Sequence, residues 1–261
     1  MQPRYHRLIL SALILVFLSA CATNIAGRKQ VMLVSESKAI EASKQAYTNT
    51  LQSFAKDGKL DNDANLVTRV NKITDKLIAQ AKLKRPETSD WEWSVKVIDD
   101  PKTVNAWCMA GGKMAIYSGL INQLQATDDE IAQVMGHEIS HALANHSAER
   151  MSIAMANNLA LELVKQAGSE TVTSMATAAA QVAITLPNSR ASESEADRIG
   201  IELAARAGYH PGAAVTLWQK MSQVSGNQGF EFLSTHPSPA NREKVLQDLI
   251  PQMMPLYQAA R

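Results

Sequence analysis

The chain has 261 residues, which is enough for one sizeable domain or two small ones. Its 26 basic and 25 acidic residues give a formal net charge of +1, so the charge balance does not favour nucleic-acid binding. Aromatic residues make up 5% of the chain and helix-forming residues are abundant, which favours a mostly helical fold. We therefore expect a globular protein with no nucleic acid among its partners.

The first 20 residues have the pattern of a cleaved secretion signal. Residues 4–7 contain two arginines and a histidine, and the apolar run that follows, residues 8–18, is short for a membrane span. Residues 18–21 read Leu-Ser-Ala-Cys, which resembles the lipobox of bacterial lipoproteins. We interpret residues 1–20 as a signal peptide and Cys21 as the lipidated first residue of the mature chain. The alternative is an uncleaved anchor helix.

The residue after Cys21 is Ala22, and resemblance to the sorting rule of such lipoproteins then favours the outer membrane. We expect a lipidated tether over residues 21–34 and one domain over residues 35–261. The protein would be a cell envelope lipoprotein at the periplasmic face of the outer membrane. Cys108 is the only other cysteine, so we expect a buried thiol without an intramolecular partner.

The segment before the main motif combines helices with a small sheet. Two helices are expected, over residues 35–56 and 62–82, and the second carries an apolar stripe. Alternation of apolar and polar residues then predicts a strand over residues 91–97. Two further strands are expected over residues 104–109 and 113–117, with a Gly-Gly turn between them. An exposed edge strand could hold an extended peptide by backbone pairing. A purely structural hairpin would give the same pattern.

The segment Gly-His-Glu-Ile-Ser-His that begins at residue 136 contains the pattern HExxH. Thr127 and Glu130 form a capping box that predicts a helix through it. His137 and His141 then lie about 40° apart on one face and can share one zinc ion, which leaves room for a third protein ligand and a water. Glu138 lies beside that face and can act as the general base. The motif also occurs by chance, so a third ligand is needed.

Two features after this helix receive provisional roles. If the helix continues, His146 lies about 140° around it from His141, so we assign it a structural role. Residues 151–186 are rich in alanine and methionine and carry few charges. We expect them to form a helical pair that covers the site. A membrane-contacting surface and a subunit contact are the alternatives.

Another helix is predicted from about Ser189 to Gly208. Glu193 and Asp197 are four residues apart and share a face, so one carboxylate can bind zinc while the other orients a histidine ligand. Glu195 points elsewhere and is the alternative ligand. A charged helix start is common, so the pattern alone leaves the choice open.

HExxH followed by ExxxD on a later helix resembles the gluzincin metallopeptidase family of the HtpX and CAAX prenyl proteases. The likeness is greater to the periplasmic BepA- and LoiP-like lipoproteins and to the Oma-type proteases, and it extends from about residue 27 to about residue 245. The resemblance implies a zincin-like α+β fold, mostly helical, with a small β-sheet beside the HExxH helix. It is carried by seven segments: Gly27-Arg28-Lys29-Gln30, Val104-Asn105-Ala106, Gly111-Gly112, Tyr117-Ser118-Gly119-Leu120, residues 137–150, residues 193–200 and Ser234-Thr235-His236-Pro237.

The resemblance implies that His137, His141 and Glu193 bind one Zn²⁺ per chain and that Glu138 is the general base. It makes Asp197 a support for the ligands.

Two residues near the C-terminus are further candidates, the first of them offered by the resemblance. His236, in a loop with Gly226, Gly229 and Pro237-Ser238-Pro239, would be a fourth ligand or a switch. Arg242, on an expected helix after the loop, would support the site or the loop. For both residues, an ordinary surface position is the alternative.

Residues 35–261 would then form a zinc metallopeptidase domain. The implied function is that of a zinc-dependent endopeptidase of the periplasm, tethered to the membrane through Cys21. It would hydrolyse misfolded or misassembled envelope proteins by zinc-activated water, with Glu138 as general base. One alternative is a zinc-bearing chaperone or assembly factor for outer-membrane proteins with secondary proteolysis. A Glu138→Gln variant that still rescued function would indicate this alternative. Another is a structural lipoprotein with an accidental motif.

Overall fold

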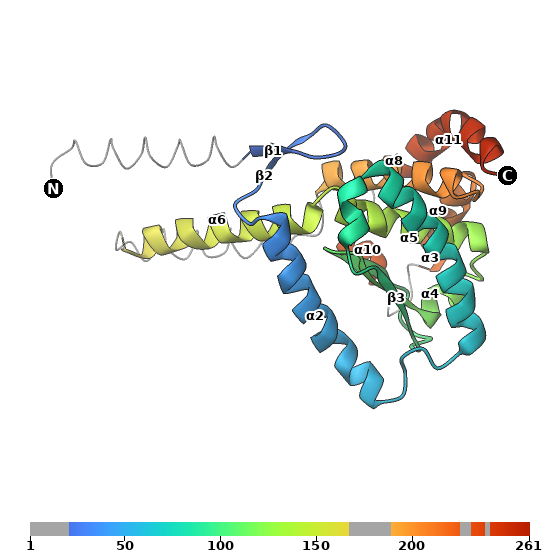
Figure 1. Cartoon of the computed structure of the whole chain (residues 1–261), viewed down its shortest axis with the longest axis horizontal. Coiled ribbons are helices and arrows are strands. Elements are labelled where there is room, and N and C mark those ends of the chain that lie inside the picture. Colours follow the sequence, from blue (N-terminus) through green and yellow to red (C-terminus); the bar gives the residue numbers. More distant parts are fainter. Residues whose placement is uncertain (1–20, 167–188, 225–230, 238–240) are drawn as a thin grey trace. The chain divides into compact units, whose positions relative to one another are not determined.

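The computed structural model describes residues 21–166, 189–224, 231–237 and 241–261 (Figure 1). The chain divides into two compact units, of which the first comprises residues 1–39 and 148–186 and the second residues 40–147 and 187–261. The proposed signal peptide and residues 167–186 of the Ala- and Met-rich stretch lie outside the described residues, as do Gly226 and Gly229.

The second unit is mostly helical and holds one small sheet, which confirms the expected α+β class. Helices α2, α3 and α8 lie within a few residues of the bounds predicted for them. Its described elements are most of α2 (Glu36–Lys56), α3 (Ala64–Lys84), η1 (Pro86–Asp90), β3 (Ser94–Ile98), β4 (Ala106–Met109), β5 (Lys113–Tyr117), α4 (Ser118–Gln123), α5 (Asp128–Leu143), α8 (Arg190–Arg206), α9 (Ala213–Val224), α10 (Phe232–Thr235) and α11 (Arg242–Ala259).

The sheet has the order β3-β5-β4, with β3 parallel and β4 antiparallel to β5. The turn between β4 and β5 contains Gly111 and Gly112 with φ of 83° and 78°, which L side chains rarely adopt. Trp91, which we expected in the first strand, instead follows η1, and the strand begins at Ser94. Among the described strands, β4 pairs only with β5 and so forms an edge of the sheet.

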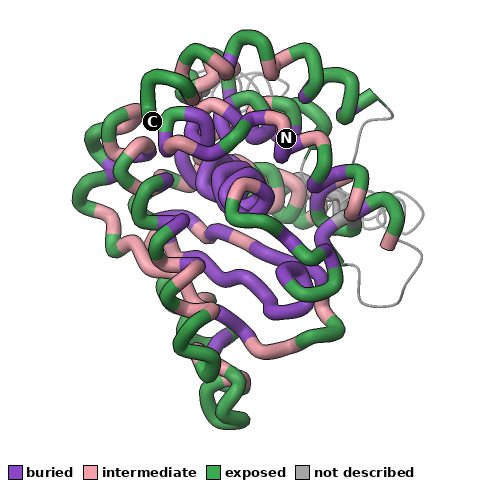
Figure 2. The backbone as a smooth tube through the Cα atoms, turned by 90° about the vertical axis from the view of Figure 1, so that its right-hand side faces the viewer, coloured by how far each residue is buried: buried purple, intermediate pink, exposed green. Residues whose placement is uncertain are grey.

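Helix α5 forms the centre of the second unit. The predicted capping box is present, since Glu130 N donates to Thr127 Oγ1 and Thr127 N donates to Glu130 Oε2. Every residue from Glu130 to Leu143 is buried, and the tube in Figure 2 shows a buried central helix. The helix contacts α3, α8, α9 and β4, and it lies beside the sheet in Figure 1. Polar side chains on α5 are therefore held in a fixed, largely dry environment.

The first unit contains a hairpin and the greater part of one helix. Strands β1 (Cys21–Thr23) and β2 (Lys29–Val31) pair antiparallel within the segment that we assigned to the tether. Helix α6 (His146–Gln166) carries Glu149, which accepts two hydrogen bonds of 2.6 and 2.7 Å from the Arg28 guanidinium. Gln30 Nε2 also donates to Glu149, at 2.8 Å. These contacts attach the hairpin to the start of α6.

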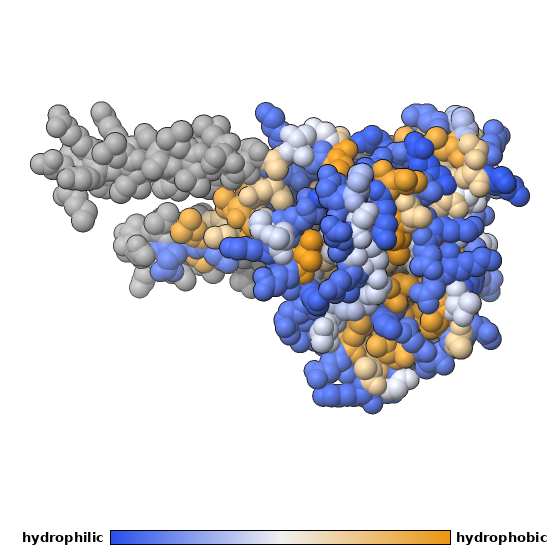
Figure 3. Space-filling view, in the orientation of Figure 1, coloured by the Kyte–Doolittle hydropathy of each residue, from blue (hydrophilic) through white to orange (hydrophobic). Residues whose placement is uncertain are grey.

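The surface of the described chain is mixed in polarity (Figure 3). Exposed large apolar side chains are concentrated on α6: Ile153, Met155 and Leu159. No helix within the described ranges combines the length and the apolar character that crossing a membrane requires.

Candidate metal centre

Two glycines bring α5 and α8 into close contact. A Cβ atom at Gly200 would lie 2.7 Å from the backbone nitrogen of His137, and one at Gly136 would lie 2.9 Å from the Gly200 carbonyl oxygen. No side chain fits between the two backbones at this crossing. The absence of Cβ atoms therefore places the first turns of α8 beside the HExxH face of α5.

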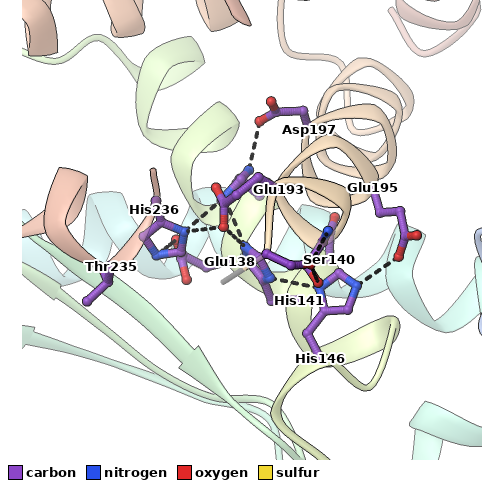
Figure 4. A network of polar contacts seen from close by, with 12 residues as sticks. Glu138, Ser140, His141, His146, Glu193, Glu195, Asp197, Thr235 and His236 are labelled. Atoms are coloured by element: carbon purple, nitrogen blue, oxygen red, sulfur yellow. Dashed lines mark hydrogen bonds and ion pairs between the residues drawn. The ribbon is translucent and has the colours of Figure 1, made fainter. Parts of the chain in front are cut away.

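Four side chains converge in the space that this crossing creates. Their donor atoms lie within 4.8 Å of one another, and all four residues are buried: His137, His141, Glu193 and His236. The first two come from α5, Glu193 comes from α8, and His236 follows α10. Figure 4 shows His141, Glu193 and His236 pointing toward one another. The structure thus brings together the proposed ligands and the fourth candidate.

The distances within this cluster fit a zinc ion. His137 Nε2 lies 3.0 Å from His141 Nε2 and 3.4 Å from Glu193 Oε2, and His141 Nε2 lies 3.3 Å from Glu193 Oε1. Ligands at zinc bond lengths of about 2.0–2.1 Å in a tetrahedron are separated by about 3.3 Å. His236 Nδ1, at 3.3 Å from His137 Nε2, satisfies the same spacing. Two imidazoles, a carboxylate and a further imidazole are also the ligand types that zinc prefers.

Asp197 and Arg242 lie behind His137 and Glu193. The Asp197 carboxylate is 2.9 Å from His137 Nδ1, one turn along α8 from Glu193. Arg242 donates to Asp197 at 2.6 Å and to Glu193 at 3.2 Å, and its guanidinium lies 3.6 Å from the centre of the Trp218 ring. All are buried or nearly so. Asp197 therefore orients His137, while Arg242 balances the charge of both carboxylates.

The protonation of the cluster without a metal follows from burial and hydrogen bonding. Burial favours the neutral form of Glu193, but hydrogen bonds with His137, His141 and His236 outweigh it and hold the pKa of Glu193 well below its ordinary value. Burial also disfavours charged His137, yet its bonds with Asp197 and Glu193 raise the pKa of His137 to about 9. Burial dominates at His141 and lowers its pKa well below the usual range.

Glu138 is buried beside the cluster but does not belong to it. Its side chain is 3% exposed, and its Oε1 lies 3.4 Å from His236 Nε2. His236 in turn stacks on Phe232, with ring centres 4.4 Å apart. The carboxylate is thus close to the proposed metal position without being one of the converging ligands, as a general base requires.

His146 is closer to the site than the sequence indicated. Helix α5 ends at Leu143, and Asn145 adopts a φ of 58°, so the assumption of a continuous helix through His146 was wrong. The turn returns His146 to within 2.8 Å of His141, measured between their Nδ1 atoms (Figure 4). Glu195, the alternative ligand, lies outside the cluster and contacts His146 at 2.9 Å. An asparagine two residues after the end of a motif helix was the available signal for this turn.

Cys108 on β4 is buried, and burial together with the charge of Glu138 raises the pKa of its thiol well above the ordinary value. This agrees with the expected buried thiol, and the raised pKa disfavours the reactive thiolate form.

Comparison with known proteins identifies the family. A profile of Peptidase family M48 matches residues 65–250. The chain is 37% identical over 155 residues to mitochondrial metalloendopeptidase OMA1 of Arabidopsis thaliana, covering 59% of this chain and 31% of that protein. It is 31% identical over 209 residues to OMA1 of Schizosaccharomyces pombe, covering 79% and 59%. Metalloprotease LoiP of Escherichia coli is 29% identical over 150 residues, covering 56% and 59%.

The chain therefore spans less than two thirds of the length of each of these relatives. The family uses zinc, and the four converging side chains of the second unit provide a matching donor set. The match over residues 65–250 includes the HExxH helix, Glu193 and His236, and on this evidence the chain belongs to peptidase family M48.

Proposed function

We propose that the protein is a zinc-dependent endopeptidase whose active site is the cluster between α5 and α8. The observation that supports this most strongly is the convergence of His137, His141 and Glu193, with both histidine Nε2 atoms within 3.4 Å of a Glu193 oxygen, next to the buried Glu138. These three residues would hold one zinc ion per chain. His236 provides either a fourth ligand or a group that occupies the remaining position.

When bound, zinc lowers the pKa of water and offers positive charge to a developing oxyanion. Glu138 takes a proton from the attacking water and passes it to the nitrogen of the leaving amine as the peptide bond breaks. Asp197 keeps the Nδ1 proton of His137 in place, so that Nε2 faces the metal position. Burial of the whole cluster excludes bulk water and strengthens each of these interactions.

A substrate peptide can bind along β4. This strand packs against α5 and, among the strands described, pairs with β5 alone. An extended peptide beside its other edge would make backbone hydrogen bonds that are independent of sequence. Such pairing favours unfolded protein segments as substrates, because a folded neighbour has no free strand to offer.

The test is zinc content and hydrolysis of the purified full-length chain. We expect about one zinc per chain by elemental analysis, and cleavage of an unfolded protein such as casein. His141→Ala should lose both the metal and the hydrolysis. His210→Ala, at an exposed histidine whose Nδ1 accepts from the backbone nitrogen of Gly212, should keep both. A fully zinc-loaded His141→Ala variant would show that the ligand assignment is wrong.

We further propose that the protein acts in the bacterial envelope on misfolded or misassembled envelope proteins, held at the periplasmic face of the outer membrane by lipid on Cys21. The basic segment, apolar run and Leu-Ser-Ala-Cys of residues 4–21 support this location. The exposed apolar side chains of α6 belong to the same unit as Cys21 and are compatible with a membrane surface.

Lipidation can be tested directly by labelling cells with radioactive palmitate and by mass spectrometry of membrane-extracted protein. The wild-type chain should carry the label and begin at Cys21, whereas Cys21→Ser should be unlabelled. Cys108→Ser is the matched control and should retain the label. A mature chain that begins elsewhere, or an unmodified Cys21, would contradict the proposal.

A further inference from the structure

On the side of His141 that faces away from the metal cluster, three buried or nearly buried side chains are linked in a row: His141, His146 and Glu195. His141 Nδ1 lies 2.8 Å from His146 Nδ1, and His146 Nε2 lies 2.9 Å from Glu195 Oε2. The His146 side chain is 1% exposed and that of Glu195 is 12% exposed. Both contacts are drawn in Figure 4. The three residues come from α5, the start of α6 and α8.

The backbone is shaped to make this arrangement. Two residues separate α5 from α6, and one of them, Asn145, has the left-handed φ of 58° that asparagine tolerates better than most residues. The end of α5 is fixed there by Arg85, whose Nη1 donates to the Leu143 carbonyl oxygen at 2.9 Å. The turn reverses the direction that an unbroken helix would give His146 and places its ring against His141.

The positions of the ring protons on His141 and His146 follow from the orientation of His141 Nε2 toward the cluster. His141 Nε2 points into the cluster and must carry a lone pair to bind a metal, so the ring proton of His141 is on Nδ1. That Nδ1–H donates to His146 Nδ1, which must accept. His146 then carries its own proton on Nε2, which donates to the Glu195 carboxylate. Because an ionised carboxylate can only accept, Glu195 requires the proton of His146 on Nε2. His146 Nδ1 must then accept from His141, which fixes the ring proton of His141 on Nδ1.

The two α5 histidines are therefore supported differently. His137 donates directly to Asp197, whose charge is offset by Arg242 at 2.6 Å. The Nδ1 atom of His141 is linked to the Glu195 carboxylate through the ring of His146, so the negative charge of Glu195 lies farther from the metal position than that of Asp197. Groups that hydrogen-bond the far nitrogen of a histidine ligand fix its orientation and raise its basicity.

We propose that His146 and Glu195 are positioning residues that hold His141 in the tautomer and orientation needed to bind the metal. The inference rests on the proposed function, because it requires His141 to be a ligand. Neither residue contacts substrate in this account. Their effect is on metal retention and on the geometry of the bound metal.

The test compares zinc affinity, by competition with a chromophoric chelator, in full-length variants. His146→Phe keeps the ring but removes the acceptor, and should weaken zinc binding by about 10–100-fold. Glu195→Gln should weaken it less, in the same direction, because an amide can still accept. His146→Asn restores an acceptor for His141 and should recover part of the loss relative to His146→Phe. The visible spectrum of Co²⁺-substituted His146→Phe should also change.

Glu202→Gln is the control, since Glu202 lies on the same helix and pairs with Lys84 at 2.8 Å, away from the cluster. It should bind zinc as the wild type does. Zinc affinity and a Co²⁺ spectrum that are unchanged in Glu195→Gln and in His146→Phe would overturn the inference, while zinc loss in His141→Ala would leave the proposed function standing. If His146→Phe does not fold, the isosteric Glu195→Gln decides the question. A wild-type chain that binds no zinc would overturn both.

Discussion

His236 Nε2 lies 3.4 Å from Glu138 Oε1, while Nδ1 of the same ring lies 3.1 Å from Glu193 Oε1. One imidazole thus contacts both the proposed base and a proposed ligand. A side chain in this position would occupy the coordination position that the other three proposed ligands leave open. We interpret His236 as a latch that holds the enzyme idle.

The latch predicts a gain of activity. His236→Ala should raise basal hydrolysis of casein and increase self-cleavage, because it frees the position next to Glu138 while the other three ligands retain zinc. Initial rates and zinc content measured on the same preparation provide the check. Loss of activity with zinc retained would instead make His236 a contact for substrate or for the transition state.

Arg242 should be a main stabilising residue of the site. Arg242→Met removes the cation that contacts Asp197 and Glu193, which are both buried, and should destabilise the chelator-treated protein by about 3 kcal/mol. Arg206→Met breaks the pair of Arg206, whose side chain is 46% exposed, with Glu202 and should cost no more than about 0.5 kcal/mol. Urea denaturation measures both changes. Equal stability of the two variants would show that Arg242 does not balance the buried charge.

The close crossing of α5 and α8 predicts that a single methyl group added at Gly200 lowers the stability of the protein. In Gly200→Ala the new Cβ would lie 2.7 Å from His137 N, so the helices must separate. We expect a loss of about 1–3 kcal/mol in unfolding free energy, together with weaker zinc binding. Ser194→Ala, at an exposed position of the same helix, should change little. A Gly200→Ala protein with wild-type stability and zinc affinity would contradict the close crossing.

Zinc binding should release protons. Burial opposes the charge on His137, but its bonds with Asp197 and Glu193 raise the pKa to about 9 in the metal-free protein. At pH 7.5 the ring is then mostly protonated, and zinc must displace about one proton. Zinc affinity should therefore rise with pH up to about 9. Calorimetric titrations in buffers of different ionisation enthalpy measure the release, and enthalpies that are the same in all buffers would refute it.

Much of the second unit could be predicted because its signals are local. The capping box of Thr127 and Glu130 specifies the start of α5, and Ser189, whose Oγ accepts from Ser192 N, specifies the start of α8. The fold class follows from these periodic segments. The resemblance supplied the residues of the cluster, which the structure then brings together.

The remainder depends on contacts between distant segments. The choice between Glu193 and Glu195 is set by the rotation of α8 against α5, which the contact of Gly136 with Gly200 determines. The approach of His146 depends on the left-handed backbone of Asn145, which interrupts the helical period on which the sequence argument relied. The parallel pairing of β3 with β5 could not be predicted either, because an alternation of apolar and polar residues indicates a strand but does not specify its partner strand.

The most direct test of a zinc endopeptidase compares the wild-type chain with Glu138→Gln, with zinc content and casein hydrolysis measured on the same samples. The substitution keeps the shape of the side chain and removes the proton acceptor, while the proposed ligands are untouched. We predict about one zinc per chain in both proteins and hydrolysis in the wild type alone. Undiminished hydrolysis by Glu138→Gln, or hydrolysis by a wild-type chain that holds no zinc, would contradict the account.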